Sequence, residues 1–170
     1  MIRLRPFKRQ DSEIIASWLT EEEGFMKWCA GMYKYPMTAQ QLCDRYDEFC
    51  KDDNGWFMTA LNDSGEVCGH FIFRKADFEN NSIHMGFIII SPEMRGRGFG
   101  KQMLSQALKY AYDILGMESV TLGIFANNES ALGCYETAGF VPTDAEKECF
   151  EFNGEKWDCI NMKATKTTEA

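Results

Sequence analysis

The first fifty residues change from a strand pattern to helical patterns. Apolar and charged residues alternate over residues 2–5 and the alternation stops at Pro6, which predicts a short strand. Asp11 or Ser12 is then expected to cap a helix, and Thr38 a second one. The apolar positions at helical spacing are Ile14, Ile15, Trp18 and Leu19 in the first helix, and Leu42, Tyr46, Phe49 and Cys50 in the second.

Strand patterns dominate from residue 55 to residue 90. Residues 55–61 and 66–74 are apolar-rich and flank the turn sequence NDSG at 62–65, which predicts a hairpin. Residues 82–90 form a third run, and its last four residues are all apolar. A continuously apolar strand is typical of a sheet that is covered on both faces, so we expect helices on both sides.

The second half of the chain alternates helix and strand patterns before it closes on a hairpin. Apolar residues from Met103 to Leu115 have helical spacing and end at Gly116, residues 120–125 are strand-like, and helix signals resume near Asn128. Residues 147–152 and 156–162 flank the dipeptide NG at 153–154, a strong hairpin signal. This order predicts an α/β fold with a mixed sheet.

Composition limits the classes of protein to consider. The chain has 170 residues, 45% of them hydrophobic, which fits one globular domain; we expect the domain at 1–163 and a polar tail at 164–170. No apolar run is long enough to span a membrane, and no leader pattern opens the chain. The net charge of −8 weighs against a nucleic-acid partner. Seven cysteines without a CxxC pair predict no disulfide framework and no metal, as in a cytoplasmic protein.

The most informative motif is RGRGFGK at residues 95–101, between an apolar strand and a long amphipathic helix. Glycines admit positive φ angles and close approach of a ligand, and helix N-termini attract anions. The arginines add charge-assisted contacts, so the loop predicts a diphosphate site. A P-loop would need glycine where Arg95 stands, and a dinucleotide loop would need glycine or alanine at Met103 or Lys101.

Residues 95–100 match the Arg/Gln-x-x-Gly-x-Gly/Ala signature of the GNAT (GCN5-related) N-acyltransferases, and the chain resembles that family. Residues 128–140 are similar to its segment Asn-x-x-Ala-x-x-x-Tyr-x-x-x-Gly-Phe. The opening, residues 2–18, looks like that of members near the ribosomal-protein acetyltransferases. The resemblance implies a mixed sheet of about seven strands, with helices on both faces and a splayed parallel pair at 83–90 and 120–125.

The resemblance also implies that acetyl-coenzyme A (acetyl-CoA) binds in the splay. Exposed backbone of the first splayed strand would pair with the pantetheine arm, and amides of the glycine loop would hold the pyrophosphate. The residues expected to bind the coenzyme are Ile88, Ile89, Ile90, Arg95, Arg97, Gly98, Phe99, Gly100, Lys101 and Asn128. Asn128 is equally well explained as a helix cap.

The implied reaction is direct transfer of the acetyl group to a primary amine of a small molecule or peptide in a ternary complex. Tyr135 matches the family's proton donor to the thiolate, although it also fits simple helix packing. His84 stands where many relatives carry a glutamate base, with Glu93 a weaker candidate, while His70 reads as structural. Nothing marks Cys134 as a nucleophile.

The acceptor and the partners are less determined by the sequence. Aromatic residues and glutamates between Trp18 and Tyr35 suit a cationic amine, and core packing explains them equally well. A non-catalytic acyl-CoA sensor on the same fold is the alternative function, and a longer acyl donor is a third interpretation. An exposed edge of the closing hairpin offers a surface for a homodimer.

Overall fold

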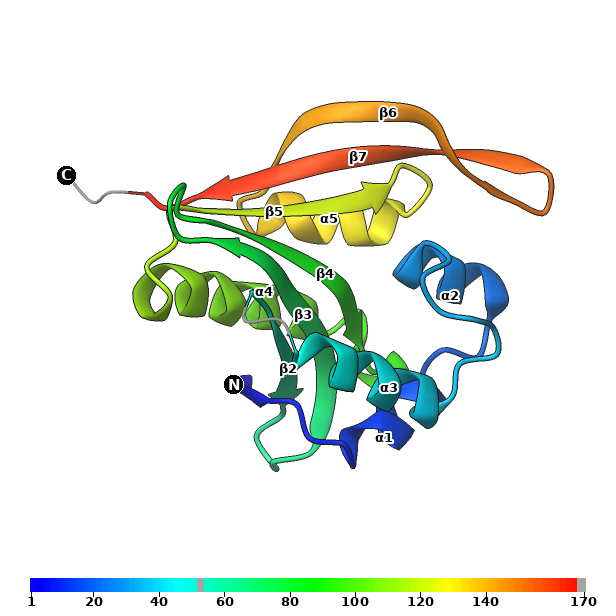
Figure 1. The fold of residues 1–170 in the computed structure, drawn as a ribbon, viewed down its shortest axis with the longest axis horizontal. Coiled ribbons are helices and arrows are strands. Elements are labelled where there is room, and N and C mark those ends of the chain that lie inside the picture. The colour runs from blue at the N-terminus through cyan, green and yellow to red at the C-terminus, as the bar shows by residue number, and fades with distance from the viewer. Residues whose placement is uncertain (52–53, 168–170) are drawn as a thin grey trace.

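One mixed sheet organises the part of the chain that this computed structural model describes, residues 1–51 and 54–167. In the sheet the order is β1-β2-β3-β4-β5-β7-β6, and only the β4–β5 pair is parallel among the described strands (Figure 1). The strands are β1 (Arg3–Pro6), β2 (Trp56–Leu61), β3 (Val67–Asp77), β4 (Ser82–Ile90), β5 (Ser119–Phe125), β6 (Val141–Phe152) and β7 (Glu155–Thr165).

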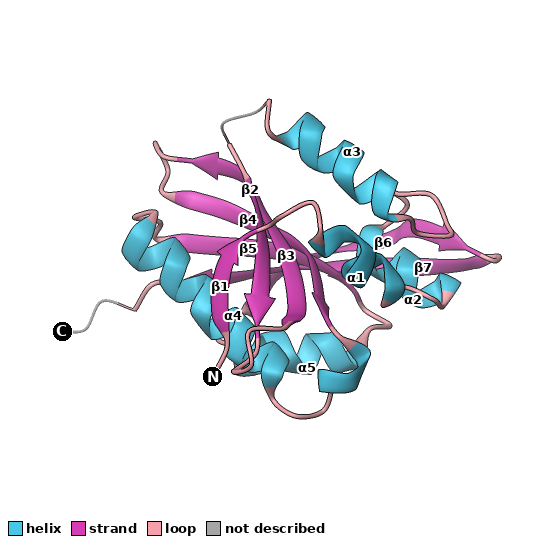
Figure 2. Ribbon diagram, turned by 90° about the horizontal axis from the view of Figure 1, so that it is seen from below, coloured by secondary structure: helices cyan, strands magenta, loops and turns pink. Residues whose placement is uncertain are grey.

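Helices cover both faces of the sheet, as the continuously apolar end of β4 predicted. Three helices lie on one face: α1 (Asp11–Ser17), α2 (Glu22–Cys29) and α3 (Ala39–Phe49). The opposite face carries α4 (Phe99–Lys109), which continues as one π-helical turn (Tyr110–Ile114), and α5 (Glu129–Thr137). Figure 2 shows the sheet between these two layers. A short 3-10 turn (Pro92–Met94) leads from β4 toward α4.

Each helical layer forms its own hydrophobic core against the sheet. Ile83 and Met85 of β4 belong to the core on the α4–α5 side, and Ile88 and Ile90 pack against it. Phe87 and Ile89 belong to the core under α1, α2 and α3. β4 thus contributes side chains to both layers, which is why the end of the strand, residues 87–90, is continuously apolar.

A bulge in β4 changes the alternation of its side chains. The pairing of β4 with β3 joins Ile72 to Gly86 and His70 to Ile89, so two residues of β4 face one of β3. Phe87 takes a φ of 52° at this point. A bulge leaves its extra residue outside the ladder and bends the strand.

The β4–β5 pair separates soon after it begins. Its register contains Ser82↔Ser119, Ile83↔Val120 and His84↔Thr121 and no later pair. β5 pairs instead along its length with β7, from Ser119↔Thr165 to Phe125↔Cys159. Figure 1 shows β4 and β5 diverging toward the end where α2 lies. The edge of β4 that faces β5 is therefore left without a strand partner beyond His84.

Several local expectations were wrong or incomplete. Asp11 does not cap α1, because its carboxylate accepts two hydrogen bonds from Arg5, at 2.7 and 2.8 Å, and one from Thr59 at 2.8 Å. Ile14 is exposed rather than on the buried face. The pattern also did not single out α2 as a separate helix.

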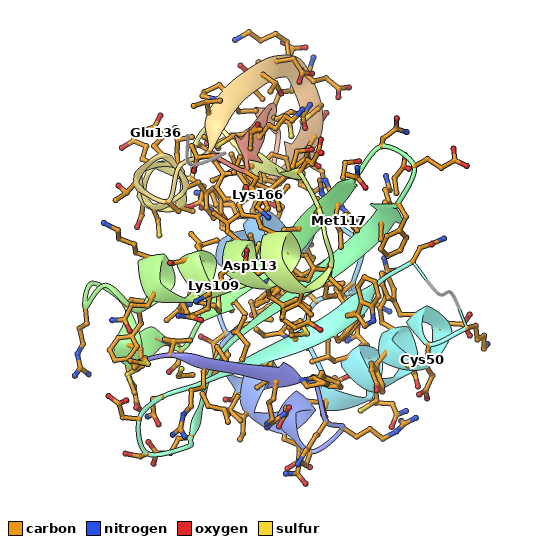
Figure 3. The ribbon with its side chains drawn as sticks, turned by 90° about the vertical axis from the view of Figure 1, so that its left-hand side faces the viewer. Cys50, Lys109, Asp113, Met117, Glu136 and Lys166 are labelled. Carbon is orange, nitrogen blue, oxygen red and sulfur yellow. The ribbon has the colours of Figure 1, made fainter. Side chains whose placement is uncertain are left out.

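The end of β7 and the π turn lie together. β7 continues to Thr165, two residues into the segment expected as a polar tail, and Ala164 is buried. Lys166 donates to the Tyr112 carbonyl at 3.2 Å and lies 3.8 Å from the Asp113 carboxylate (Figure 3). The last part of the expected tail, 168–170, lies outside the described residues. Among the described helices, none is long and apolar enough to cross a membrane.

Candidate active site

The glycine loop has the backbone that a pyrophosphate site requires. Gly96 and Gly98 have φ angles of 70° and 78°, in the left-handed region that favours glycine. Gly98 immediately precedes α4, and its carbonyl accepts a hydrogen bond from the Gln102 amide at 3.1 Å. The amides before Gln102 belong to the first turn of the helix, which has no intrahelical acceptors for them. A Cβ atom at either glycine would meet no protein atom within 4 Å, so the space before the loop is open.

The two loop arginines add positive charge at the same place. Arg95 and Arg97 are exposed, and neither forms an ion pair within the described residues. Arg95 Nε donates to the Ile90 carbonyl at 3.1 Å, and the Arg97 guanidinium lies 5.5 Å from the Phe99 ring centroid. Unpaired guanidinium groups beside a helix N-terminus suit a ligand with two negative charges.

Gly100 is the point where three predicted parts of the site meet. A Cβ atom there would lie 3.2 Å from Cys134 Sγ and 3.9 Å from Ile90 Cγ1. The start of α4, the end of β4 and the middle of α5 are thus in close contact. Tyr135, the expected proton donor, is the next residue along α5 from this junction.

Tyr135 is set into the core beneath this junction. Its side chain is 8% exposed, and its ring centroid lies 6.1 Å from that of Phe140. Burial raises the pKa of the phenol well above its ordinary value. The hydroxyl therefore keeps its proton at neutral pH, which is the state that a proton donor needs.

Asn128 does not use its side chain to cap α5. It occupies the N-cap position, where its backbone N–H donates to the Phe125 carbonyl at 3.0 Å, but its side chain makes no capping hydrogen bond. The cap explanation offered by the sequence is thus removed. The amide is half-buried and available to a ligand, so coenzyme contact remains the prediction for this residue.

His84 lies where β4 and β5 part. Its Nδ1 is 3.0 Å from Thr121 Oγ1, and it projects toward the α1–α3 side, since Ile83 and Met85 face the other core. Burial, followed by the positive charges of Arg74 and Lys75, lowers the pKa of His84 to about 4. The imidazole is neutral at pH 7 and can accept a proton, but as a weak base.

The remaining candidates have settings that do not favour a catalytic role. Glu93 is exposed on the 3-10 turn, and burial raises the pKa of the Cys134 thiol, which leaves it a poor nucleophile. His70 is completely buried, with its ring centroid 5.7 Å from that of Phe7 and 5.6 Å from that of Phe57. In the described part of the chain, no three His, Cys, Asp or Glu side chains gather as metal ligands.

A hollow of about 780 Å³ opens between α2, the loop that follows it and α3. Of the aromatic residues expected to line an acceptor pocket, Tyr33 and Tyr35 line the hollow, whereas Phe25 is fully buried in the core. Glu22 is the one predicted acidic residue that lines it. Tyr33 packs between the hollow and the bulge of β4, since its ring lies 5.6 Å from that of Phe87.

Two arginines that no sequence motif indicated lie beside the bulge. The guanidinium of Arg74, from β3, lies 5.5 Å from the Phe87 ring centroid, and that of Arg45, from α3, lies 5.8 Å from it. Neither arginine belongs to a recognisable motif, and they are 29 positions apart in the chain. No local sequence signal therefore indicates that they lie together. Only the packing of α3 on the sheet brings them together.

Comparison with known proteins identifies the family. The model of the acetyltransferase (GNAT) domain matches residues 2–141. A spermidine N(1)-acetyltransferase of Escherichia coli K12 is 25% identical over 168 residues, covering 95% of this chain and 84% of that protein. One from Vibrio cholerae is 33% identical over 93 residues, 55% of this chain and about half of that protein (49%).

The fold agrees with solved structures. A crystal structure of spermidine N-acetyltransferase from Vibrio cholerae in complex with CoA and spermine has a TM-score of 0.83 at 24% identity, covering 96% of this chain and 95% of that one. These relatives are named for spermidine and not for ribosomal proteins, so the expected nearness to ribosomal-protein acetyltransferases is corrected. The family match extends over most of the chain and includes the glycine loop and Tyr135, and the chain belongs to the GNAT acetyltransferase family.

Proposed function

We propose that this acetyl-CoA-dependent N-acetyltransferase transfers the acetyl group by direct attack of a small primary amine in a ternary complex. The separation of β4 from β5 beyond His84 carries the proposal. It leaves peptide groups of β4 without a strand partner, and the end of this strand lies against the start of α4, next to the glycine loop. Two reactants held at such a place gain the rate advantage of proximity.

The residues that would hold the coenzyme fit its chemistry. Amides from Arg97 to Lys101 and the arginine side chains suit a pyrophosphate, and the open edge of β4 at residues 87–90 suits the amide groups of a pantetheine arm. Asn128 adds an uncommitted amide near α5. When bound, acetyl-CoA supplies the activated thioester.

Tyr135 and the β4 backbone carry the proposed chemistry on the thioester side. The amine nitrogen forms a bond to the carbonyl carbon, and the carbon–sulfur bond breaks. The Ile88 N–H is the proposed donor to the carbonyl oxygen, as in an oxyanion hole. Tyr135 gives its proton to the departing sulfur, for which the raised pKa keeps it protonated.

His84 is the candidate acceptor for the proton that the amine loses, directly or through water. Its hydrogen bond to Thr121 orients the ring at the vertex of the splay. Its lowered pKa means that the amine must arrive largely deprotonated, because a base with a pKa of about 4 takes a proton from an ammonium ion only weakly.

Steady-state assays of the purified chain test the proposal. Acetyl-CoA and a panel of primary amines, with spermidine first because the relatives are named for it, should give acetylated amine and free CoA in equal amounts. Initial rates at varied concentrations of both substrates should give intersecting double-reciprocal lines, as a ternary complex requires. Parallel lines would contradict direct attack.

The alternative is a non-catalytic acyl-CoA sensor, which is motivated by the absence of a glutamate at the position of His84 on β4. Calorimetry separates the two functions. Binding of CoA without turnover of any amine would support the sensor, and the absence of CoA binding at millimolar concentration would contradict both.

A further inference from the structure

Two positively charged groups meet at the bulge of β4 without an anionic partner. The Arg45 and Arg74 guanidinium groups both lie over the ring of Phe87, and one nitrogen of each approaches Met32 Sδ, at 3.6 and 3.9 Å. Within the described residues, neither arginine forms an ion pair with a carboxylate. Two like charges in a half-buried place repel each other unless an anion lies between them.

Neighbouring groups add further hydrogen-bond donors. Arg74 Nε, the Trp28 indole N–H and the Tyr33 hydroxyl are buried and have no hydrogen-bond partner among the described residues. Tyr33, which is 7% exposed, stacks on Trp28 with ring centroids 5.3 Å apart, and both rings pack against Phe87. Buried donors are normally paired, so an oxyanion would complete this set.

This donor cluster stands next to the proposed point of acetyl transfer. A Cβ atom at Gly86 would lie 3.6 Å from Arg74 Nε, so the guanidinium covers the strand just where it has left β5. Arg45 and Tyr33 also line the hollow of about 780 Å³. Met32, whose Sδ both guanidinium groups approach, lines the hollow as well, so a molecule bound there lies close to the two arginines.

We propose, on the basis of the proposed function, that the acceptor is a primary amine that carries a carboxylate, and that Arg45 and Arg74 bind this carboxylate. Guanidinium groups match carboxylate oxygens in a paired geometry. A polyamine has no oxyanion for the two arginines to bind. Glu22, Asp44 and Glu48 also line the hollow, but none of them pairs with Arg45, so they leave the guanidinium free for a ligand.

The test compares matched acceptors. Amino acids and ω-amino acids, each beside its carboxamide, are assayed with acetyl-CoA together with spermidine. We expect kcat/KM for the preferred acid to exceed that for its carboxamide by at least about tenfold, since one charge-assisted contact is worth that much. R74Q and R45Q should each lower kcat/KM for the acid by about tenfold or more, mainly through KM, and change the amide less than about threefold.

Two further variants control for folding and for general loss of charge. R74K keeps the charge but not the paired donors. Its KM for the acid should therefore lie between the KM values of the wild type and of R74Q. R3Q removes an exposed arginine whose guanidinium meets only the Asp63 carbonyl among the described residues, and should behave as wild type. Unchanged CoA affinity shows that each variant is folded.

The outcomes separate this inference from the proposed function. Faster turnover of spermidine than of every carboxylate-bearing amine overturns the inference and leaves the acetyltransferase intact. Equal losses for acid and carboxamide in R74Q and R45Q also overturn it. Acetylation of none of the amines, with CoA bound, overturns the proposed function and the inference with it.

Discussion

Tyr135 is buried and yet adjacent to the candidate site, whereas active residues are usually accessible. It is almost completely buried, which raises the pKa of its phenol, and its neighbour Cys134 contacts the turn where the glycine loop becomes α4. A higher pKa makes the phenol a weaker acid but guarantees its protonated state. For a leaving thiolate, which is more basic than the thioester sulfur, a protonated donor in place matters most.

Replacement of Tyr135 by phenylalanine should lower kcat by about 10²–10⁴-fold, the usual contribution of a general acid, and change the Kd for CoA less than about threefold. Steady-state kinetics and calorimetry measure the two quantities. Tyr112→Phe is the matched control, since its hydroxyl is also buried, has no described partner and lies on the π turn. If Y135F and Y112F lose equal activity, Tyr135 is a packing residue.

His84 leads to a prediction about pH. A base works only when unprotonated, and the pKa of His84 is lowered from 6.5 to about 4, so kcat/KM should not fall around pH 6.5 through this residue. After correction for the fraction of neutral amine, kcat/KM should fall on the acidic side only near pH 4. H84Q should remove this acidic limb of the pH profile and lower the rate at pH 7 by at least about tenfold. E93Q, at the exposed alternative, should leave the profile unchanged. A limb at pH 6.5 would contradict this assignment.

At the scale of elements, the glycine loop has two distinct needs for glycine: a left-handed φ angle, and open space for the ligand. Gly98 has a φ of 78° and Gly65, in the β2–β3 turn, has a φ of 81°; a Cβ atom at either would meet no atom within 4 Å. The two positions are therefore strained alike by a side chain. The two positions differ in their surroundings: the open space at Gly98 faces a helix N-terminus, and the space at Gly65 does not.

Gly98→Ala and Gly65→Ala should each lower the free energy of unfolding by about 1–2 kcal/mol, the cost of a left-handed residue with a Cβ. Only Gly98→Ala should weaken CoA binding, by at least about fivefold, because its methyl group enters the space proposed for the pyrophosphate. Denaturant unfolding and calorimetry make the comparison. Equal CoA affinity in the two variants would place the pyrophosphate elsewhere.

The elements differ in how far the sequence could predict them. The hairpin at Asn153 and Gly154 and the loop at Gly96 and Gly98 were predicted because a positive φ restricts the residue type, and all four residues have one. α2 was missed because its mixed pattern reads equally as core packing and as an acidic surface. Arg45 and Arg74 were missed because only tertiary packing of α3 over β3 places them together.

At the scale of the whole molecule, the sheet consists of two parts that share only a short seam. β1 to β4 form one part and β5, β7 and β6 the other, joined by the pairs from Ser82↔Ser119 to His84↔Thr121. The bulge at Phe87 bends β4 away, and β5 satisfies its backbone with β7 instead. The unpaired edge is thus a property of the topology, and no single residue creates it.

Hydrogen exchange tests this arrangement in the intact chain. Without ligand, amides in 86–90 that face β5 should exchange faster than those of β5, which pair with β7 along the whole strand. Addition of CoA should slow exchange in 86–90 and 97–101 and leave the β6–β7 hairpin unchanged, because that hairpin lies beyond β5 from the proposed arm. Mass spectrometry of peptic peptides resolves these segments. Protection spread evenly over both parts of the sheet would mean that CoA stabilises the fold as a whole and does not complete the edge of β4.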